Sequence, residues 1–468
     1  MIRISWGKKF LIPIWKSCWS IAVRIDLPQP DQFAALWATV TGSPLKDPVA
    51  GIASDHRELQ PGDLFLALKG ARVDGHQLLQ PAKDRGAVAA LVSEAVDPVD
   101  GLRLYRVASV EETLGNLARS WRQRFSIPVL GITGSNGKTT TKELVRACLS
   151  RSGHPHCTTG NFNTSLGVPL SLLTLTADHT HSVIEMGANQ PGDIRYLASL
   201  VKPTLGLVTN VAPAHLEGFK NLETIVSEKE SLLTADSLET AFINLSDEHC
   251  RTMQFRGRKV TFGFDTNADY AGRSDRSSAR PRLQINGHTL NLPTAHPALE
   301  KNALAAASVA RELGISWSDI SAAVARFEPV RGRGEVLTFR GLTVINDTYN
   351  ANVESTRTAL EFLRSYPSRG RKIFVFGDMF EMGEAAEQSH AAVGQACLEA
   401  GPDAVFTVGN FSEIVARVTS ARIPSFHFKS KETLQDKLRR FCRRDDVLLV
   451  KGSRGMAMET LIQGLEGN

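Results

Sequence analysis

The stretch Val129-Leu-Gly-Ile-Thr-Gly-Ser-Asn-Gly-Lys-Thr-Thr-Thr-Lys142 is the part of the sequence that decides the fold. Its apolar beginning predicts a buried strand over 129–133, and the residues after it predict a helix over 138–150. In the turn between them, Gly134 and Gly137 permit close backbone approach to a ligand, while N–H groups at the start of the helix attract negative charge. The stretch therefore predicts a phosphate-binding loop between a strand and a helix of an α/β domain.

The side chains of this loop extend the prediction to a nucleoside triphosphate. Lys138 is placed to reach the terminal phosphates, and the Thr139 hydroxyl is placed to ligate Mg²⁺. The strict P-loop pattern requires glycine five residues before Gly137, where this chain has Ile132, so the loop is a variant. The loop residues predicted to bind the nucleotide are Thr133, Gly134, Ser135, Asn136, Gly137, Lys138, Thr139 and Thr140.

The charge distribution argues against a nucleic-acid partner. The 468 residues carry a formal net charge of +5, but five basic residues precede the first acidic residue, Asp26. The remainder carries 49 basic and 49 acidic residues and has no net charge. A basic patch such as 251–259 therefore predicts a solvated face rather than a track for phosphates.

Composition and cysteine spacing predict a globular protein of the cytoplasm. Hydrophobic residues make up 42% and charged residues 22% of the chain, as in globular domains, and no apolar run approaches the ~18 residues of a membrane span. The cysteines are scattered without a Cys-x-x-Cys pair, which disfavours a zinc ribbon or a disulfide scaffold. They are Cys18, Cys148, Cys157, Cys250, Cys397 and Cys442.

The length and the order of apolar runs predict three α/β domains after an N-terminal extension. The extension covers 1–28, and we prefer it to a signal peptide or a membrane-surface segment because Pro13 and Lys16 break its apolar core. The predicted domains are 29–126, 127–328 and 329–468. In the second and third domains, strands alternate with helices, which predicts parallel sheets covered on both faces. The predicted strands of these domains are 129–133, 182–186, 205–210, 342–346, 373–376, 404–408 and 447–450.

Polar residues follow the predicted strands, where α/β proteins place their ligands. Glu185 ends a strand near the loop, so its carboxylate is a candidate Mg²⁺ ligand. His215 follows the next strand, and Asn161 and Asn163 offer amide groups on a loop after the first crossover. On spacing alone, His215, Asn161 and Asn163 also fit ordinary structural roles. Lys229 by itself fits a solvated helix lysine.

The third domain carries a further polar cluster at a strand end. Asp347-Thr-Tyr-Asn-Ala-Asn352 follows the strand 342–346, and its Tyr349, Asn350 and Asn352 predict ligand contact rather than core packing. Two glycine-flanked cations, Arg333 and Lys451, are candidates to stabilise charge on a transferring phosphate, with surface exposure as the alternative.

Taken together, these residues resemble the Mur ligases, ATP-dependent amide-forming enzymes of peptidoglycan precursor synthesis. The resemblance runs from about residue 29 to the end of the chain. The variant loop Thr133-Gly-Ser-Asn-Gly-Lys-Thr139 is similar to the family's own form. Ile184-Glu-Met-Gly187, Thr209-Asn210 with His215, and Asn302 in an alanine-rich helix match further family positions.

Three motifs are similar to those of the family members that add D-alanyl-D-alanine. They are Asp347-Thr-Tyr-Asn-Ala-Asn352, Phe376-Gly-Asp-Met-Phe-Glu-Met-Gly383 and Val450-Lys-Gly-Ser-Arg454. The resemblance implies that ATP phosphorylates the terminal carboxylate of UDP-N-acetylmuramoyl-tripeptide and that the amine of D-alanyl-D-alanine attacks the acyl phosphate. Both substrates are small molecules, and we expect a monomer. Lysine or diaminopimelate as the third peptide residue stays open.

The resemblance also implies roles for individual residues. Lys138 and Thr139 would bind the ATP phosphates and one Mg²⁺, with Glu185 and His215 completing the metal sites. Lys229 matches the lysine that the family carbamylates to obtain an additional metal ligand. ATP would be contacted at the adenine by Asn302 and from the third domain by Arg333 and Asp347. In the first domain, Ser54, Asp55 and Arg57 would bind the uridine nucleotide end of the substrate.

Two positions depart from the family pattern. His56 stands where the family usually has a small hydroxyl residue in the uridine-binding motif. The family's Gly-x-His precedes its asparagine by four residues, whereas Ala295-His296 precedes Asn302 by six.

Four alternatives to this interpretation exist. Another Mur-type ligation step uses the same loop chemistry but different third-domain motifs. A folylpolyglutamate synthase is expected to carry Gly-Lys-Gly-Ser where this chain has Gly137-Lys-Thr-Thr140. A P-loop switch or nucleic-acid-driven ATPase is disfavoured by the charge neutrality outside the first residues. A relative that binds substrate without catalysis is disfavoured because Lys138, Glu185 and Lys229 are all present.

Overall fold

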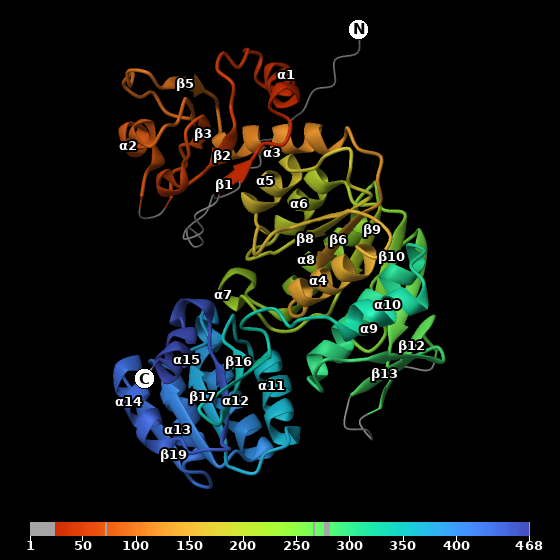
Figure 1. Cartoon of the computed structure of the whole chain (residues 1–468), viewed down its shortest axis with the longest axis vertical. Helices are drawn as coiled ribbons and strands as arrows, with labels where there is room; N and C mark the ends of the chain where they lie inside the picture. The colour runs from red at the N-terminus through yellow and green to blue at the C-terminus, as the bar shows by residue number, and fades with distance from the viewer. Residues whose placement is uncertain (1–23, 71–72, 265–266, 276–280, 468) are drawn as a thin grey trace. The chain divides into compact units, whose positions relative to one another are not determined.

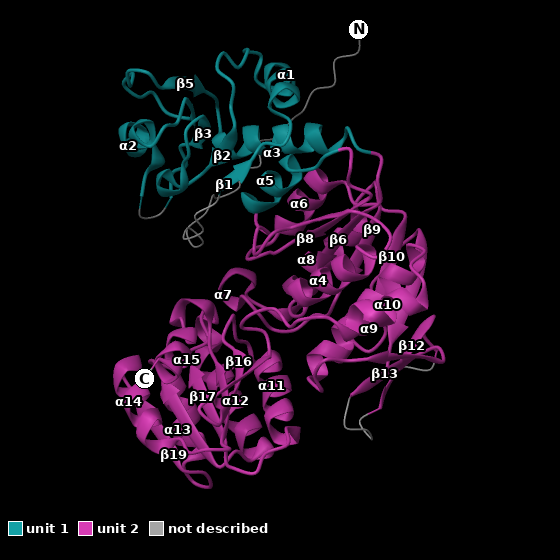
Figure 2. Ribbon diagram, in the orientation of Figure 1, with its two compact units in different colours: residues 1–125, 165–176 teal, residues 126–164, 177–468 magenta. Residues whose placement is uncertain are grey.

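The computed structural model describes residues 24–70, 73–264, 267–275 and 281–467, arranged in two compact units (Figure 1, Figure 2). Unit 1 consists of Met1–Phe125 and Ser165–Thr176, and unit 2 consists of Ser126–Thr164 and Ala177–Asn468. Most of the predicted extension 1–28 lies outside the described residues. The predicted domain boundaries stay predictions.

In the described part of unit 1, five strands form one sheet in the order β1-β2-β3-β4-β5. β1 is antiparallel to β2 and pairs with it, so ordered structure begins before residue 29, while the other neighbours are parallel. The strands are β1 Arg24–Asp26, β2 Gly51–Ala53, β3 Asp63–Leu66, β4 Ala89–Val92 and β5 Arg103–Arg106. The α-helices are α1 Pro30–Thr41, α2 Leu79–Asp84, α3 Val110–Arg122 and α5 Gly167–Leu173.

Unit 1 encloses its own core. Every residue of β3 and β4 is buried, as expected for parallel strands covered on both faces. Helix α3 begins where the Ser109 side chain accepts the Glu112 N–H at 3.2 Å, which is a standard N-cap. The Trp121 indole N–H donates to the Leu175 carbonyl at 3.0 Å and joins α3 to the segment after α5.

Within the described residues of unit 2, the larger sheet has nine strands in the order β14-β13-β12-β11-β10-β9-β6-β8-β7. They are β6 Val129–Thr133, β7 Pro155–Cys157, β8 His181–Glu185, β9 Leu205–Val208, β10 Thr240–Asn244, β11 Arg258–Gly263, β12 Tyr270–Asp275, β13 Arg282–Ile285 and β14 His288–Asn291. The accompanying α-helices are α4 Lys138–Leu149, α6 Asp193–Val201, α7 Leu216–Phe219, α8 Leu222–Glu230, α9 Pro297–Glu312 and α10 Trp317–Ala325.

The larger sheet differs from the sequence prediction at one end. From β7 to β12 all neighbours are parallel, as predicted, but β13 and β14 are antiparallel additions. The burial of β13 alternates between exposed and buried residues, which is the pattern of an antiparallel strand with one solvated face. The parallel sheet predicted from the alternation of strands and helices is thus extended by two antiparallel strands that this alternation does not predict.

The core of this sheet explains where the glycine loop lies. Apolar residues of β6, β8, β9 and β10 pack with α4, α9 and α10 in one buried cluster. Helix α4 presents Leu144, Val145, Cys148 and Leu149 to that cluster, so its first turn is left at the carboxyl end of β6. Packing therefore fixes the start of α4 directly behind the loop.

In the part of unit 2 that the structure describes beyond residue 326, six strands form a second sheet in the order β15-β16-β20-β17-β18-β19. β15 is antiparallel to β16, and the other neighbours are parallel. The strands are β15 Glu335–Phe339, β16 Leu342–Asp347, β17 Lys372–Gly377, β18 Ala404–Val408, β19 Ser425–Phe428 and β20 Val447–Lys451. The α-helices are α11 Val353–Ser365, α12 Ala386–Ala400, α13 Ser412–Thr419, α14 Lys431–Phe441 and α15 Glu459–Glu466.

Alternation along the central strand β17 buries both faces of the second sheet. Phe374 and Phe376 pack into the cluster with α11 and α12, whereas Ile373 and Val375 pack into the cluster with α14 and α15. The α/β class with three sheets is confirmed.

The described residues also bear on the predictions that the cysteines form no disulfide scaffold and that the chain has no membrane span. Cys148, Cys157, Cys250, Cys397 and Cys442, the cysteines within the described ranges, are free. In the same ranges, no helix has both the length and the apolar character needed to cross a membrane.

Candidate nucleotide and metal site

The loop after β6 has the backbone geometry that its glycines predict. Gly134 and Gly137 have φ values of 143° and 82°, which residues other than glycine rarely adopt. A Cβ added to Gly134 would lie 2.0 Å from the Thr209 hydroxyl oxygen, and one added to Gly137 would lie 2.3 Å from Oδ1 of Asn302. Both positions therefore require glycine for conformation and for space.

Residues after β9 hold the loop in place. The Asn136 N–H donates to Oδ1 of Asn210 at 2.9 Å, and the Asn210 amide donates back to the Asn136 carbonyl at 2.9 Å. The Thr209 hydroxyl donates to the same carbonyl at 2.6 Å, and the Ser135 N–H donates to the Asn210 carbonyl at 3.0 Å. Thr209 and Asn210 thus form a rigid support under the loop.

Lys138 begins α4 and is folded over the loop. Its Nζ donates to the Gly134 carbonyl at 2.6 Å. Burial lowers the pKa of Lys138, and the nearby positive charge of Arg333 lowers it further, while Glu185 opposes the shift. The ammonium therefore lies among charged groups at the N-terminus of a helix, where an anion would be attracted.

Thr139, Asn163 and Glu185 meet beside Lys138. Oε1 of Glu185 accepts the Thr139 hydroxyl at 3.1 Å and the Asn163 amide at 2.8 Å. Oε2 of Glu185 is buried and has no hydrogen-bond partner among the described residues. A buried carboxylate oxygen without a donor is costly, and hard oxygen ligands suit Mg²⁺. The donor set therefore fits Mg²⁺. Asn161 lies on the same loop, where its carbonyl accepts the Asn163 N–H at 2.7 Å.

Lys229, near the end of α8, is buried rather than solvated, with 3% of its surface exposed. Its Nζ lies 5.7 Å from the centre of the Phe219 ring. Burial, reinforced by the charge of Lys138, lowers its pKa to about 7, and Glu228 and Asp193 only partly oppose this. The alternative of a solvated helix lysine was wrong.

His215 lies at the start of α7 with a left-handed φ of 54°. Its Nδ1 contacts Oε2 of Glu381, which follows β17. The hydrogen bond with His215 is the main reason why the pKa of Glu381 is lowered, against the opposing effect of burial. His215 and Glu381 are 166 positions apart in sequence but are neighbours in the folded chain.

Helix α9 contributes the predicted residue Asn302 and begins at His296. Asn302 is buried and packs against Gly137. His296 caps the helix, since its Nδ1 accepts the Ala298 N–H at 3.1 Å. Burial lowers the pKa of His296 to about 4.

The predicted residues just before β15 and at the ends of β16 and β20 form a second group. The Arg333 guanidinium lies 3.8 Å above the Tyr349 ring. Lys451, with 2% of its surface exposed, donates to Asp347 at 2.6 Å and to the Asn350 carbonyl at 2.9 Å. The surface alternative for Lys451 was therefore wrong.

Asn352 connects this group to the glycine loop. Its Oδ1 accepts the Ser355 N–H at 2.8 Å and caps α11, and its Nδ2 donates to Oδ1 of Asn136 at 2.8 Å. Asn352 thus caps α11, which packs on the second sheet, and also donates a hydrogen bond to the glycine loop after β6 of the first sheet.

The predicted uridine-binding residues lie in unit 1, between β2 and β3. Asp55 pairs with Arg57 at 2.6 Å and accepts the Arg57 N–H at 2.9 Å. The hydrogen bonds from the Arg57 side chain are the main cause of a lowered pKa at Asp55. Ser54 precedes Asp55 and His56 lies between Asp55 and Arg57, and both are half-buried.

A cluster of possible metal ligands in unit 1 was not predicted. Asp74, His76 and Glu94 gather there, but Lys69 already pairs with Glu94 at 2.7 Å. Nε2 of His76 accepts the Ser93 N–H at 3.0 Å, so this nitrogen is occupied. Internal partners account for the cluster.

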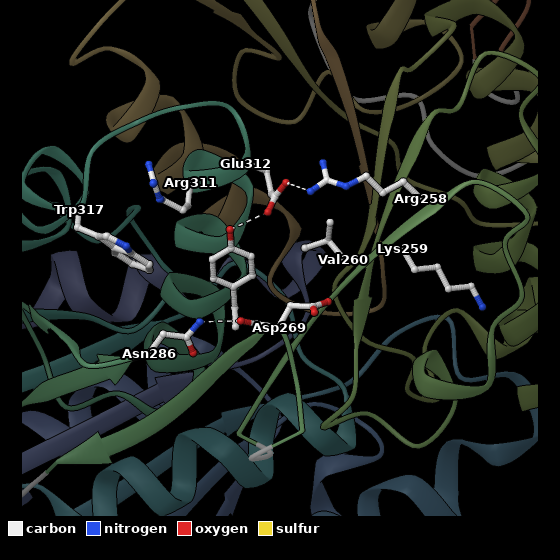
Figure 3. Close-up of a pocket in the computed structure, with 9 residues that line it drawn as sticks. Arg258, Lys259, Val260, Asp269, Asn286, Arg311, Glu312 and Trp317 are labelled. Atoms are coloured by element: carbon white, nitrogen blue, oxygen red, sulfur yellow. Dashed lines mark hydrogen bonds and ion pairs between the residues drawn. The ribbon is translucent and has the colours of Figure 1, made fainter.

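A cavity of about 520 Å³ lies between β11, β12 and the helices α9 and α10 (Figure 3). Glu312 in its wall accepts the Tyr270 hydroxyl at 2.7 Å and pairs with Arg258 at 2.5 Å. The lining residues are Arg258, Lys259, Val260, Asp269, Tyr270, Asn286, Arg311, Glu312 and Trp317. None of them is a predicted site residue.

Sequence reasoning missed the contributions of Glu381 and of the Asp347–Lys451 ion pair. Glu381 belongs to the motif Phe376–Gly383, which served only to compare the chain with a family. The sequence signal for Glu381 was a carboxylate between the apolar residues Phe380 and Met382, shortly after the predicted strand 373–376.

Family models match most of the chain. The Mur ligase middle domain matches residues 132–310, and the glutamate ligase domain of the Mur ligases matches residues 326–454. The catalytic domain of the Mur ligase family matches residues 48–122.

Curated relatives and solved structures agree with these matches. The UDP-N-acetylmuramoyl-tripeptide–D-alanyl-D-alanine ligase of Escherichia coli (strain K12) is 34% identical over 433 residues, which span 89% of this chain and 94% of that protein. The ligase of the same name from Bacillus subtilis (strain 168) is 30% identical and covers 89% and 93%. The crystal structure of MurF from Acinetobacter baumannii has a TM-score of 0.83 at 28% identity and covers 93% and 98%. MurF ligase from Thermotoga maritima in complex with ADP has a TM-score of 0.77 at 29% identity and covers 89% and 96%.

Proposed function

Because this chain belongs to the Mur ligase family, we propose that it joins D-alanyl-D-alanine to UDP-N-acetylmuramoyl-tripeptide at the expense of ATP. The observation that carries the proposal is the glycine loop, whose Lys138 lies beside the Thr139–Glu185 contact at the start of α4. The product is the pentapeptide precursor of peptidoglycan.

The reaction has two steps. A carboxylate oxygen of the tripeptide attacks the terminal phosphorus of ATP, the bond from that phosphorus to ADP breaks, and an acyl phosphate forms. The amine of D-alanyl-D-alanine then attacks the carbonyl carbon, the amine loses a proton, and phosphate leaves as the amide bond forms. Both steps build negative charge on phosphate oxygens, so fixed positive groups lower their barriers.

The residues of the loop bind and orient the triphosphate. The N–H groups at the start of α4 and the Lys138 ammonium attract its phosphates. Arg333, which acts electrostatically on Lys138, adds positive charge from the segment before β15, and Asp347 lies in the same group. Asn302 packs against the loop at Gly137, where it can contact the base.

In this proposal Thr139, Glu185, His215 and Lys229 would hold Mg²⁺. When bound, it offsets the charge of the phosphoryl group. The unpaired Oε2 of Glu185 supports this assignment.

Lys229 joins the metal ligands by carbamylation. Its neutral amine adds to the carbon of CO₂ and loses a proton, which produces a carboxylate at the end of the side chain. Only the unprotonated amine reacts, and a pKa of about 7 leaves much of Lys229 unprotonated near neutral pH.

The uridine nucleotide end of the substrate binds Ser54, Asp55 and Arg57, and the peptide end binds Asn161, Asn163, Tyr349, Asn350 and Asn352. The protein works as a monomer in the cytoplasm. The free thiols support that location, and sedimentation at the mass of one chain is the expected result.

The test is a reaction with defined substrates. Purified protein is incubated with ATP, Mg²⁺, D-alanyl-D-alanine and either the lysine or the diaminopimelate tripeptide, while phosphate release and product mass are followed. A pentapeptide formed with one phosphate per amide bond supports the proposal, and the preferred tripeptide identifies the third residue. Phosphate release without any amide product from either tripeptide would contradict it.

A further inference from the structure

The segment 378–383, here called the 378–383 turn, follows β17 and is held at its start by Asp378. The buried carboxylate of Asp378 accepts the N–H groups of residues 410–412 at distances from 2.7 to 3.1 Å. A carboxylate with three backbone donors is firmly fixed, so the turn leaves the strand in a defined direction.

Further contacts fix the middle of the 378–383 turn. The Met379 N–H donates to Nε2 of the buried His390 at 3.0 Å, and the Phe380 N–H donates to the Ser453 hydroxyl at 2.8 Å. The Met379 side chain and, after Glu381, that of Met382 are buried in the core with α12. Glu381 therefore projects from a rigid base.

The partner of the 378–383 turn is the start of α7. The His215 carbonyl accepts the N–H groups of Gly218 and Phe219 at 3.0 and 3.1 Å, so His215 and α7 form one turn. Phe219 is buried, and its ring lies under Lys229. The orientation of this turn therefore bears on both His215 and Lys229.

Two hydrogen bonds join the turns at Glu381. Its carboxylate contacts Nδ1 of His215, and its carbonyl accepts the Glu217 N–H at 3.0 Å. His215 and Glu381 both have left-handed backbones, with φ of 54° and 61°. Residues with side chains rarely adopt this conformation, so both turns have a specific backbone geometry at the contact.

We propose that Glu381 is a positioning residue that orients the His215 imidazole for metal binding. The proposal rests on the metal role assigned to His215 above. An ionised carboxylate only accepts hydrogen bonds, so Nδ1 of His215 must carry the proton in this contact. The lone pair of the neutral ring then lies on Nε2, which is the nitrogen left to bind a cation.

The contact also gives a role at the proposed metal site to the motif Phe376–Gly383, which lies far from the glycine loop in sequence. A carboxylate behind a metal-binding histidine fixes its tautomer and its orientation. Here that carboxylate comes from the second sheet of unit 2, whereas His215 follows the first sheet. The metal site of one sheet is thus completed by a residue of the other.

The experiment is a titration of the full-length protein with Mn²⁺ in the presence of a non-hydrolysable ATP analogue, with free Mn²⁺ counted by electron paramagnetic resonance. The variants are Glu381→Ala, Glu381→Gln, His215→Ala and the double variant His215→Ala/Glu381→Ala. Glu384→Ala is the matched control, because Glu384 is exposed, three residues away and has no partner among the described residues.

Glu381→Ala should weaken Mn²⁺ binding about 10–100-fold, the usual effect of removing such a partner. Glu381→Gln keeps an acceptor oxygen and should weaken binding less, while the control should match the wild type. In the His215→Ala background, Glu381→Ala should have no further effect, which a merely structural role of Glu381 would not produce.

Three results would overturn the proposal. Unchanged Mn²⁺ affinity in Glu381→Ala would remove the role of Glu381 while leaving the proposed function intact. An equal loss with and without His215 would show that Glu381 acts elsewhere. If the wild-type protein bound no Mn²⁺ with the analogue, the metal assignment in the proposed function would fail as well.

Discussion

Buried lysines in unit 2 fall into two kinds. Lys142 and Lys451 each lie beside a carboxylate, at 2.9 Å from Glu143 and 2.6 Å from Asp347, so their charges are compensated. Lys229 lies instead over an aromatic ring and has its pKa lowered to about 7. Burial without a paired carboxylate is costly for a charged amine, and such positions are typical of functional lysines.

Replacing Lys229 tests its chemical role. Lys229→Ala should lose activity roughly 10–100-fold, and short carboxylic acids should restore part of it by occupying the place of the carbamate. The measurement is phosphate release with increasing formate or acetate. Lys301→Ala, at an exposed position of α9, is the control. An unchanged Lys229→Ala rate, or a loss that no acid restores, would argue against carbamylation.

Lys138 should matter for phosphate transfer itself. Lys138→Ala removes the ammonium at the start of α4 and should reduce ADP release roughly 10²–10³-fold, the usual cost of losing one fixed electrostatic group. The rate is followed in a coupled assay for ADP, again beside Lys301→Ala. A Lys138→Ala rate within a few-fold of the wild type would remove Lys138 from the reaction.

At the scale of elements, the sequence predicted what local patterns determine. Apolar runs that end at glycine or polar residues located β6, β8, β16 and β18, and the glycines of the loop predicted its conformation. Contacts such as Asn136–Asn352 and His215–Glu381 join segments 216 and 166 residues apart, and no local pattern encodes them. The antiparallel pairing of β13 and β14 was not predicted, because the alternation of strands and helices indicates only the parallel part of the sheet.

The loop between β6 and α4 gives a test of close packing. Gly137→Ala forces a side chain into a left-handed conformation and against Asn302, so it should raise the Kd of an ATP analogue at least about tenfold. Gly42→Ala is the matched control, because Gly42 has a similar φ of 72° but no atom near the added Cβ. Calorimetric titration compares the two variants. Equal binding by both would mean that the loop does not hold the nucleotide.

His296, which caps α9, should make the stability of the protein depend on pH. The pKa of His296 is about 4 in the folded state and 6.5 in the unfolded chain, so only the unfolded chain binds this proton between those values. His296 should therefore lower stability as the pH falls from about 6.5 to about 4. Asparagine can replace it as a helix cap without titrating.

The measurement is the urea midpoint of the wild type and of His296→Asn at pH 7.5 and pH 5. The wild type should lose more stability on acidification than the variant, even though the variant loses ring packing against Phe362 at both pH values. The same pH-dependent loss in both proteins would show that His296 protonates without cost when folded.

At the scale of the whole molecule, the proposed reaction uses ATP to activate a carboxylate for attack by an amine. The family models and the curated relatives cover most of the chain, and the two sheets of unit 2 each supply part of the proposed machinery. The uridine-binding residues belong to unit 1.

An oxygen label follows the atoms of the carboxylate through the proposed reaction. The tripeptide is prepared with ¹⁸O in its terminal carboxylate, and the phosphate released during ligation is analysed by mass spectrometry. If the carboxylate attacks the terminal phosphorus of ATP, one ¹⁸O atom must appear in each released phosphate, and the amide product must retain the other. Released phosphate without the label would contradict the account.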